Sequence, residues 1–457
     1  MANSRNTDTQ KIEKGLEKIL EPFQEFVHSQ TTASVWLLIC TVIALVLVNS
    51  GYSHNYFELF HTRLGLILGE ISFSMSLSHW INEGLMALFF FLLGMEIKRE
   101  VLVGDIREFD KLVPIGFAAL GGMLVPASIY YAFSHGTPYA SGWGITMATD
   151  TAFAVGVLAL LGKKIPLSAF TFLTALAILD DLGAILVITL FYSDSLDYAY
   201  LGISFAVLLA LILCNISGIR RPSIYFCIGV VLWAAMLKSG IHATVAGILV
   251  ASSVPARAAR KPTWFLTYTA SLVSKFSRLE RDRSKDAPIL GEPEQHRVVE
   301  KIRHASEKAS TPLRRWEGAF EHPVALFILP VFALANAGIP ISGIDMASVW
   351  SDPLVLGIIL GLVVGKCLGI SAFTWIALKL KLGSLPQGLD MRHVIGLGLL
   401  GGIGFTMSIF ITNLGFETMD DVLNRAKFSI LLGSFIAGVA AFIWFRVIPK
   451  SAANDTD

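Results

Sequence analysis

The chain has 457 residues, of which 54% are hydrophobic and 16% are charged, and its formal net charge is +1. Soluble proteins average roughly 45–50% apolar and about 25% charged residues, so this composition disfavours a water-soluble protein. A net charge near zero offers no electrostatic basis for binding nucleic acid.

Residues 1–33 are polar, mixed in charge and without a signal-peptide core, so we expect a retained N-terminal segment. Apolar stretches follow that match the roughly 17–25 residues needed to cross about 30 Å of hydrocarbon. Twelve such stretches begin near Ala33, Trp80, Leu112, Trp143, Ser168, Asp197, Pro222, Gly240, Pro323, Pro353, His393 and Phe428, the eighth being short. They predict an all-α polytopic membrane protein with about 12 transmembrane helices and both termini on one side.

Lys and Arg in the connecting loops predict the orientation, because cationic loops stay in the cytoplasm. With the N-terminus inside, the inner loops carry Lys98, Arg99, Arg107, Lys111, Lys163, Lys164, Arg220, Arg221, Lys379, Lys381 and Arg392. The outer loops carry only Arg63, Lys238, Arg425 and Lys427. The predicted organisation is a cytoplasmic N-terminal segment (1–33), spans 1–8 (34–254), a long cytoplasmic loop (255–322), spans 9–12 (323–448) and a cytoplasmic tail (449–457).

The fourth span contains a polar cluster, from Thr146 to Thr151, with Gly142 and Gly144 just upstream. Asp150 is the only formally charged residue between Lys111 and Lys163. Ser, Thr and Asp side chains compete for backbone hydrogen bonds, so the cluster predicts a helix that unwinds at mid-membrane. Unwound backbone is tolerated there only around a cavity or a buried site.

The fifth span contains two adjacent carboxylates. Asp180 and Asp181 lie in an apolar run, Ile165 to Ser193, that has no other charged residue. Each would cost about 2.5–3.5 kcal/mol at the centre of a bilayer, and intramembrane acids mark functional sites by default. A pair at a helix end in water is the alternative, but at least twelve uncharged residues flank the pair on each side.

The long inner loop, Pro255 to Glu321, holds fourteen Lys and Arg residues interspersed with acids. Its stretch from Ser271 to Ser310 is charged and poor in apolar residues. This pattern fits a solvated cytoplasmic tether, and a regulatory surface is the alternative.

The tenth span carries Lys366 as the only charged residue between Pro353 and Leu378. A lysine near a helix end can extend its ammonium to the membrane surface, but one at mid-span needs a partner. Asp180 or Asp181 is the natural candidate. Adjacent helical residues differ in direction by about 100°, so one aspartate can pair with Lys366 while the other faces a cavity.

The eleventh span is rich in glycine, with Gly396, Gly398, Gly401, Gly402 and Gly404 preceding Phe405-Thr406-Met407-Ser408. The glycines alone fit close helix packing or a second helix break equally well. Spans four and eleven are each the middle of a three-span unit, and the two units start from opposite faces of the membrane. Interruptions at matching places in such units predict inverted repeats with a midplane site between them.

Five collinear segments carry a family resemblance: Phe90–Glu100, Ala148–Ala154, Ala177–Ala184, Lys238–Thr244 and Gly402–Ser408. Together they resemble the signature segments of the NhaA family of sodium/proton antiporters. The similarity extends from about Ala33 to Val447 and implies a secondary active transporter rather than an enzyme.

The resemblance also implies residue roles. Asp181 matches the principal ion-binding carboxylate, Asp180 matches its neighbour that pairs with the tenth-span lysine, Lys366, and Thr149 and Asp150 match the polar pair of the broken span. Asp180 and Asp181 would hold the sodium ion. Residues that match a pH response are Glu96, Arg99, Glu100, His242 and Glu317. The segment from about Leu64 to Leu77 resembles the hairpin through which family members form homodimers.

The chain departs from the family at two places. Glu317 is followed by Gly318 where the family commonly has histidine, and the inner loop is longer than usual. Both leave the details of the pH response open. For Glu96, Arg99 and Glu100, a solvated helix end that follows the positive-inside rule is an equally good interpretation.

The function predicted from these features is electrogenic exchange of Na+ or Li+ for external protons, by alternating access and with pH-dependent activity. We expect a bacterial inner membrane, contact with lipid, a homodimer, no cofactor and no nucleic acid. A solute symporter would need an organic-substrate pocket, and no conspicuous basic or aromatic cluster marks one. An intramembrane aspartyl protease would need two facing carboxylates but gives Lys366 no role.

Overall fold

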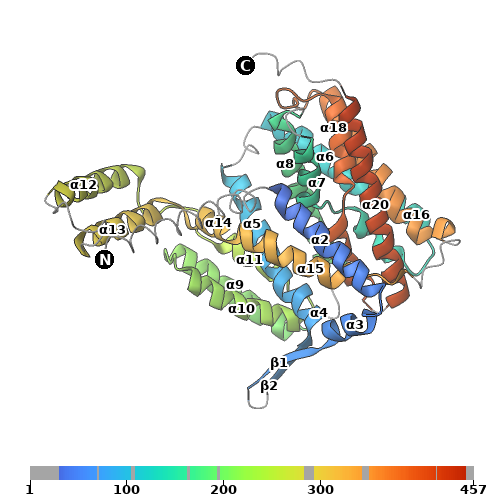
Figure 1. Ribbon diagram of the computed structural model, residues 1–457, viewed down its shortest axis with the longest axis horizontal. Helices are drawn as coiled ribbons and strands as arrows, with labels where there is room; N and C mark the ends of the chain where they lie inside the picture. The colour runs from blue at the N-terminus through green and yellow to red at the C-terminus, as the bar shows by residue number, and fades with distance from the viewer. Residues whose placement is uncertain are drawn as a thin grey trace, which may run out of the picture.

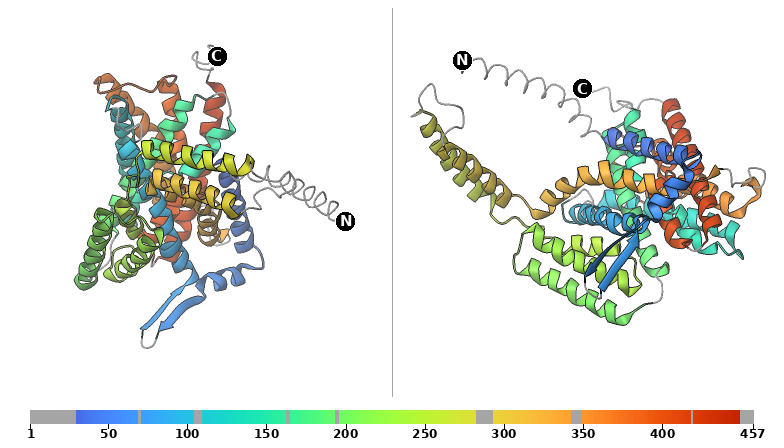
Figure 2. Two further views of the ribbon diagram at one scale, coloured as in Figure 1. Left: turned by 90° about the vertical axis from the view of Figure 1, so that its left-hand side faces the viewer. Right: turned by 60° about the horizontal axis from the view of Figure 1, so that its bottom comes forward.

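The computed structural model describes residues 30–68, 71–103, 109–161, 165–192, 196–281, 293–341, 349–417 and 419–448. Within these ranges the helices form one bundle, and the only strands make a small hairpin at one end of it (Figure 1). A second hairpin, made of two helices, projects from the side of the bundle (Figures 1 and 2). The predicted all-α class is confirmed. The N-terminal segment up to residue 29 and the tail after residue 448 lie outside the described residues.

The first part of the chain builds one side of the bundle and the β-hairpin. Its elements are α2 (Gln30–Val48), α3 (Ser53–His61), β1 (Arg63–Leu68), β2 (Ile71–Ser76), α4 (Leu77–His79), the π-helical turn η1 (Trp80–Leu85) and α5 (Met86–Val103). β1 and β2 pair antiparallel, with Arg63 opposite Ser76. The segment expected to form a hairpin therefore does so.

The remaining elements are α6 (Phe109–Ser134), η3 (Ala140–Thr146), α7 (Thr151–Leu160), α8 (Leu167–Phe191), α9 (Tyr198–Ile216), α10 (Pro222–Ser239), α11 (Val245–Ser253), α12 (Pro262–Arg281), α13 (Pro293–Ala309), α14 (Pro312–Pro323), η5 (Val324–Ile328), α15 (Leu329–Asn336), η7 (Val349–Ser351), α16 (Pro353–Leu360), η8 (Gly361–Gly365), α17 (Lys366–Lys379), α18 (Met391–Gly401), α19 (Phe405–Gly415) and α20 (Asp420–Val447). Local residue chemistry sets several boundaries. Asp197 and Asp352 cap α9 and α16, and Gly240, with φ of 84°, ends α10 in the left-handed conformation.

The helices fit a multi-pass membrane protein. Among the described residues, eight helices are long and apolar enough to cross a membrane, and counting each bent pair as one span raises the number to ten. The bent pairs are Thr32–Val48 with Ser53–His61, at 114°, and Met391–Gly401 with Phe405–Gly415, at 45°. The other two spans expected from the sequence correspond to α5 and α11. Since α11 has only 9 residues, the eighth apolar stretch is short in the structure too.

Both predicted interruptions are present. In the fourth span, the 3-10 helix η3 ends at Thr146, and α7 begins at Thr151 after four non-helical residues. In the eleventh span, α18 ends at Gly401 and α19 begins at Phe405. Each break frees backbone groups that a continuous helix would satisfy, so partners are needed within the protein.

The two three-span units have opposite orientations, as inverted repeats require. Along α6, Gly121 lies against Gly369, Pro126 against Gly365, and Tyr130 against Gly357. Residue numbers rise on one helix as they fall on the other, so α6 runs antiparallel to α16 and α17. The closest approach is at the glycine pair, where a Cβ built on Gly369 would lie 2.1 Å from the Gly121 carbonyl oxygen.

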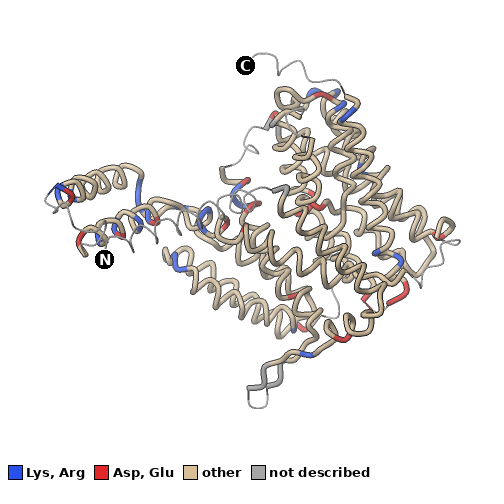
Figure 3. Tube along the Cα trace, in the orientation of Figure 1, with Lys and Arg blue, Asp and Glu red and all other residues tan. Residues whose placement is uncertain are grey.

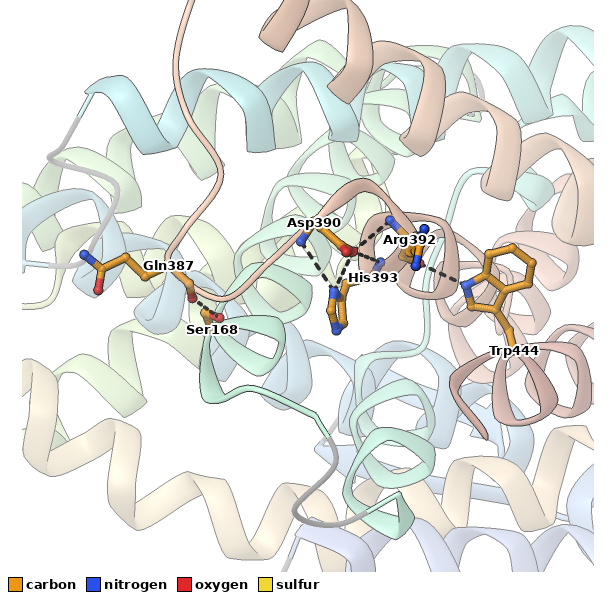
Figure 4. Close-up of polar contacts among 6 residues, drawn as sticks. All are labelled: Ser168, Gln387, Asp390, Arg392, His393 and Trp444. Atoms are coloured by element: carbon orange, nitrogen blue, oxygen red, sulfur yellow. Dashed lines mark hydrogen bonds and ion pairs between the residues drawn. The ribbon is translucent and has the colours of Figure 1, made fainter. Parts of the chain in front are cut away.

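Hydrogen bonds at the start of α18 hold this helix against two neighbours (Figure 4). Asp390 accepts from the backbone N–H of Arg392 and of His393, both at 3.0 Å, and its own N–H faces the His393 ring. The Ser168 hydroxyl, at the start of α8, donates to the Gln387 carbonyl at 2.8 Å. The Trp444 indole on α20 donates to the Arg392 carbonyl at 2.9 Å. One end of the interrupted eleventh span is therefore fixed.

Candidate functional site

Charged residues lie mainly at the ends of the bundle and on the helical hairpin, with isolated charges deep inside (Figure 3). Four of the buried charged residues, Asp150, Asp180, Asp181 and Lys366, gather where the two interrupted helices cross. There the Asp150 N–H donates to the Ile403 carbonyl at 2.6 Å, and the Ser408 hydroxyl donates to the Ile145 carbonyl at 2.7 Å. Each break thus supplies hydrogen-bond partners for the other, which stabilises non-helical backbone at the centre of the bundle.

Asp150 caps two half-helices at once. One carboxylate oxygen accepts from the Phe153 N–H of α7 at 3.1 Å. The other accepts from the Thr406 N–H of α19 at 3.0 Å and from the Thr406 hydroxyl at 2.5 Å. Because helix N-termini carry partial positive charge, a carboxylate between two of them is stabilised. The structure therefore places Asp150 at crossed half-helix ends.

The second cluster joins Asp180, Lys366 and Thr149, all fully buried. The Lys366 ammonium donates to Asp180 Oδ2 at 2.6 Å and to Thr149 Oγ1 at 3.0 Å. The Thr149 hydroxyl lies 2.9 Å from Asp180 Oδ2 and 3.0 Å from the Gly401 carbonyl oxygen. A hydroxyl has one proton, so Thr149 donates to one of these two oxygens at a time. Lys366 pairs with Asp180, one of the two candidate partners.

Asp181 lies beside this cluster, 4% exposed, outside the pair with Lys366. Oδ1 of Asp181 and Oδ1 of Asp180 are both buried and accept no hydrogen bond from the part of the chain that the structure describes. Buried polar atoms normally have partners, so unpartnered carboxylate oxygens call for an explanation. Two carboxylates, the Thr149 hydroxyl and the Gly401 carbonyl make an all-oxygen donor set, which suits a hard cation or a proton.

An irregular helix presents Lys366. The π-helical turn η8 ends at Gly365, directly before the lysine. A Cβ on Gly365 would lie 2.7 Å from the Pro126 Cα, so the glycine lets this turn press against α6. π-Helical turns occur frequently at functional sites. The sequence analysis did not predict this turn.

The residues matched to a pH response lie in two separate places. Arg99 on α5 pairs with Glu317 on α14 at 2.7 Å and with Glu100 at 3.5 Å, and Glu96 is in electrostatic range of Arg99 and Glu317. Gly318, where the family commonly has histidine, is exposed with open space around it.

His242 lies elsewhere, in the turn between α10 and α11. One ring nitrogen is 2.7 Å from the Tyr192 carbonyl oxygen, and the other is 3.9 Å from a Glu83 oxygen. Glu83 also accepts from the Ala243 N–H at 3.0 Å. Glu83 and Glu96 are thirteen residues apart on one helical segment, roughly 20 Å at 1.5 Å per residue. The structure therefore does not bring His242 together with the Arg99 cluster.

A cavity of about 790 Å³ opens beside Glu83 and His242. A chain of hydrogen-bonded amides lines it, since Asn336 donates to the Asn82 side chain at 2.8 Å and Asn413 donates to Asn336 at 2.7 Å. Lys427 also lines the cavity, whereas Asp180 and Asp181 do not. The cavity and the aspartate pair are thus distinct features of the molecule.

Sequence reasoning missed three contributors to these clusters. Thr406 was noticed only as part of a break, yet its hydroxyl makes the shortest contact to Asp150. The Gly401 carbonyl was unforeseen because backbone groups leave no mark in a sequence. Glu83 could have been found, as an acid three residues after Trp80, near which the second apolar stretch begins.

The comparisons with known proteins give one consistent result. The family model described as Na+/H+ antiporter 1 matches residues 24–445. A protein of Psychromonas ingrahamii named Na(+)/H(+) antiporter NhaA 2 is 45% identical over 444 residues, covering 97% of this chain and 93% of that protein. A Shewanella denitrificans protein named Na(+)/H(+) antiporter NhaA 1 is 45% identical over 452 residues, covering 99% of this chain and 100% of its own. A Sulfurimonas denitrificans protein named Na(+)/H(+) antiporter NhaA is 43% identical over 441 residues, covering 96% of this chain and 98% of that protein.

Proposed function

Because the chain belongs to the Na+/H+ antiporter 1 family, we propose that it exchanges sodium or lithium for protons across a bacterial inner membrane. The observation that carries the proposal is the buried pair Asp180 and Asp181, which has unpartnered oxygens beside Lys366 at the crossing of two broken helices. The proton gradient drives the exchange, so the protein is a secondary active transporter without a cofactor.

Competition for the carboxylates couples the two ions. Burial favours the neutral, protonated form of Asp181, whereas a dehydrated sodium ion needs the ionised form. Proton and sodium therefore exclude each other at the same oxygens. Asp181 is the principal ligand, with Asp180, the Thr149 hydroxyl and the Gly401 carbonyl completing the set.

Lys366 makes the exchange electrogenic. In the proton-loaded site Asp181 is neutral and Asp180 balances the ammonium, so the net charge is zero. Sodium then binds between two ionised carboxylates, and the displaced lysine loses its proton. Two protons leave as one sodium enters, and the sodium-loaded site carries one negative charge. Reorientation of these two forms moves net charge across the membrane, so the membrane potential contributes to the driving force.

Alternating access follows if only occupied sites reorient. The crossed half-helices, capped by Asp150, form the moving site, and the remaining helices form the frame. The Lys and Arg asymmetry of the loops supports a cytoplasmic location for both termini. Glu96, Arg99 and Glu100 lie in the cytoplasmic half of α5, where Glu317 of α14 contacts Arg99. We assign these four residues, together with His242, to pH-dependent activation.

The β-hairpin is the proposed homodimer contact. A two-stranded sheet leaves an unpaired edge on each strand, and such edges pair readily with another chain. β1 and β2 project from the bundle, where a second copy can reach them (Figure 1).

The test is Asp181→Asn in everted vesicles and in proteoliposomes, with Na+, Li+ and K+ added in turn. We expect Na+ and Li+ to collapse an acid-inside gradient with the native protein and not with the variant. The matched control is Asp197→Asn, which changes an aspartate that caps α9 outside the site. Sodium-dependent collapse by the Asp181 variant at the native rate, with comparable protein in the membrane, rejects the proposed site.

A further inference from the structure

The long loop contains a folded element, the hairpin of α12 and α13. The buried residues between the two helices are Leu272 on α12 and Gln295, Val298 and Ala305 on α13. The base of the hairpin is closed by a hydrogen bond of 3.0 Å from the Arg260 N–H to the Lys308 carbonyl. Residues 282–292, between the two helices in the sequence, lie outside the described part. Much of the loop is therefore helical.

The outward faces of the two helices differ in chemistry. From Pro262 to Ser274, α12 has no charged residue, although the surrounding loop is rich in charge. Leu266 is 67% exposed, Val273 is 54% exposed and Ala270 is also exposed. Their spacing of four and three residues places them on one face of the helix. On α13, by contrast, the exposed residues include Arg297, Glu300, Lys301, Arg303 and His304.

Basic and aromatic side chains flank the apolar face of α12. Arg260 and Lys261 precede it, and Lys275, Arg278 and Arg281 follow it, all exposed. Lys275 also lies 3.9 Å from Glu294 in an exposed ion pair. Trp264 stacks on Tyr268 at 5.1 Å between ring centroids, and the Arg260 guanidinium lies 5.5 Å from the Trp264 ring. Exposed apolar residues bordered by Lys, Arg and Trp are typical of helices that lie in a membrane interface.

The hairpin is attached where a span ends. Helix α11 ends at Ser253, and the Leu313 N–H at the start of α14 donates to the Pro255 carbonyl at 3.3 Å. The hairpin extends sideways from this point, away from the bundle, as Figure 1 and the right-hand view of Figure 2 show. Because α11 and α14 tether α12 beside the bilayer, even weak contacts with lipid suffice to keep α12 on the membrane surface.

We propose that α12 lies on the cytoplasmic leaflet, with Leu266, Ala270 and Val273 at the acyl boundary and the flanking basic residues on anionic phospholipid headgroups. The charged outer face of α13 then points to water. This inference goes beyond ion exchange and depends only on the membrane assignment. The anionic surface of the leaflet is the occupant that the charges favour, because basic residues lie on both sides of the apolar face. The acid of α12, Glu280, accepts a hydrogen bond of 2.8 Å from Gln295 on α13.

The experiment measures the depth of spin labels on the full-length protein in vesicles, after replacement of its four cysteines. Labels are placed at Ala270→Cys and at the matched control Arg297→Cys on α13. In vesicles with phosphatidylglycerol, we expect the label at 270 to collide more with oxygen than with a water-soluble nickel chelate. The label at 297 should show the reverse, with several-fold more nickel collisions.

Charge dependence is the second readout. Pure phosphatidylcholine, or the triple change Lys275→Gln, Arg278→Gln and Arg281→Gln, should raise nickel access at position 270 several-fold. Lys301→Gln on α13 should leave it unchanged. Equal nickel access at 270 and 297 in anionic vesicles overturns the proposal. Low nickel access at 270 that is the same in anionic and in pure phosphatidylcholine vesicles also overturns it. Strong spin–spin coupling between labels at 270 overturns it too, because it would show a second copy on this face.

Discussion

At the scale of single residues, neighbours in the chain acquire different environments. Asp180 and Asp181 are adjacent, yet Asp180 Oδ2 lies 2.6 Å from the Lys366 ammonium while Asp181 makes no such pair. Successive helical residues point about 100° apart, so a helix that aims one carboxylate at α17 must aim the next elsewhere. The geometry therefore separates a carboxylate that pairs with Lys366 from one that lies outside this ion pair.

Thr406 offers a test of how strongly Asp150 is held. Thr406→Val keeps the shape of the side chain and removes the hydroxyl 2.5 Å from the carboxylate. A hydrogen bond to a charged group contributes about 1.5–3 kcal/mol, so we expect a loss of that size in thermal or denaturant unfolding. The matched control is Thr374→Val, since Thr374 is buried and donates only to its own helix, to the Ile370 carbonyl at 2.7 Å. Equal losses for the two variants would contradict a special role for Thr406.

Much of this site could be predicted because its charged members are conspicuous. Asp150, Asp180 and Lys366 each interrupt a long uncharged run, and the structure gathers them at the crossing of the broken helices. Thr406 could not be singled out, because threonines are common in spans and a hydroxyl satisfied by its own helix looks identical in sequence. The role of the Gly401 carbonyl could not be predicted at all, because every residue has a backbone carbonyl and the sequence does not mark the one that faces the site.

At the scale of helices, glycine acts in two ways that the sequence could not separate. Gly121 and Gly369 allow close packing of α6 on α17, whereas the stretch from Gly401 to Gly404 forms the break between α18 and α19. The alternatives for the eleventh span, packing or interruption, are distinguished only by the partner that each glycine meets. The π-helical turn before Lys366 was unpredictable for the same reason, because its residues, Gly361–Gly365, also suit an ordinary helix.

The close contact between Gly121 and Gly369 predicts that a larger residue at position 369 lowers both stability and sodium affinity. A Cβ at position 369 would sit 2.1 Å from the Gly121 carbonyl oxygen, so Gly369→Ala must push α17 away from α6. Such overpacking costs about 1–3 kcal/mol of folding stability. The shift of α17 also displaces Lys366, which lies one helical turn before Gly369. We expect lower unfolding stability together with a lower apparent affinity for sodium in the exchange assay.

Gly116→Ala on α6 is the control, because no atom lies within 4 Å of its added Cβ. That variant should be neutral, or more stable by about 0.5–1 kcal/mol, since alanine is the better helix former. Native affinity in Gly369→Ala would show that the close approach of α6 and α17 does not position the lysine.

The cap of α18 predicts a pH dependence of stability (Figure 4). Partial burial raises the pKa of Asp390, but the N–H and ring of His393 and the N–H of Arg392 outweigh it, so the pKa lies below its usual value. The folded state therefore favours the ionised form, and this stabilisation is present above the unfolded pKa of about 3.9 and is lost as pH falls through the folded value. Asp390→Ala should cost about 1 kcal/mol near neutral pH.

The difference between native protein and Asp390→Ala should shrink as unfolding is measured below about pH 4. Thermal unfolding of both proteins from pH 7 to pH 3 checks this. A constant difference across that range would mean that the side chain stabilises α18 by packing, without a contribution from its charge.

At the scale of the whole molecule, the proposed alternating access requires the crossed half-helices to move against the remaining helices. The amide chain at the 790 Å³ cavity lies on that boundary, because Asn413 belongs to α19 whereas Asn336 belongs to α15 and Asn82 to η1. The contact between Asn413 and Asn336, at 2.7 Å, thus joins a repeat unit to its frame, and the contact between Asn336 and Asn82, at 2.8 Å, stays within the frame. If the site alternates by such a movement, only the first contact must break in each cycle.

Cross-linking distinguishes these two contacts in one protein. After replacement of the native cysteines, Asn336→Cys with Asn413→Cys, joined by a short thiol cross-linker, should stop sodium/proton exchange in proteoliposomes. Binding of sodium to one face of the locked site should still release protons. The control pair Asn82→Cys with Asn336→Cys, joined by the same reagent, should retain exchange. Because both pairs share position 336 and the cavity, the effect of the reagent itself is matched. Full exchange by the cross-linked 336–413 pair would mean that α19 and α15 move together, and the boundary between site and frame would have to lie elsewhere.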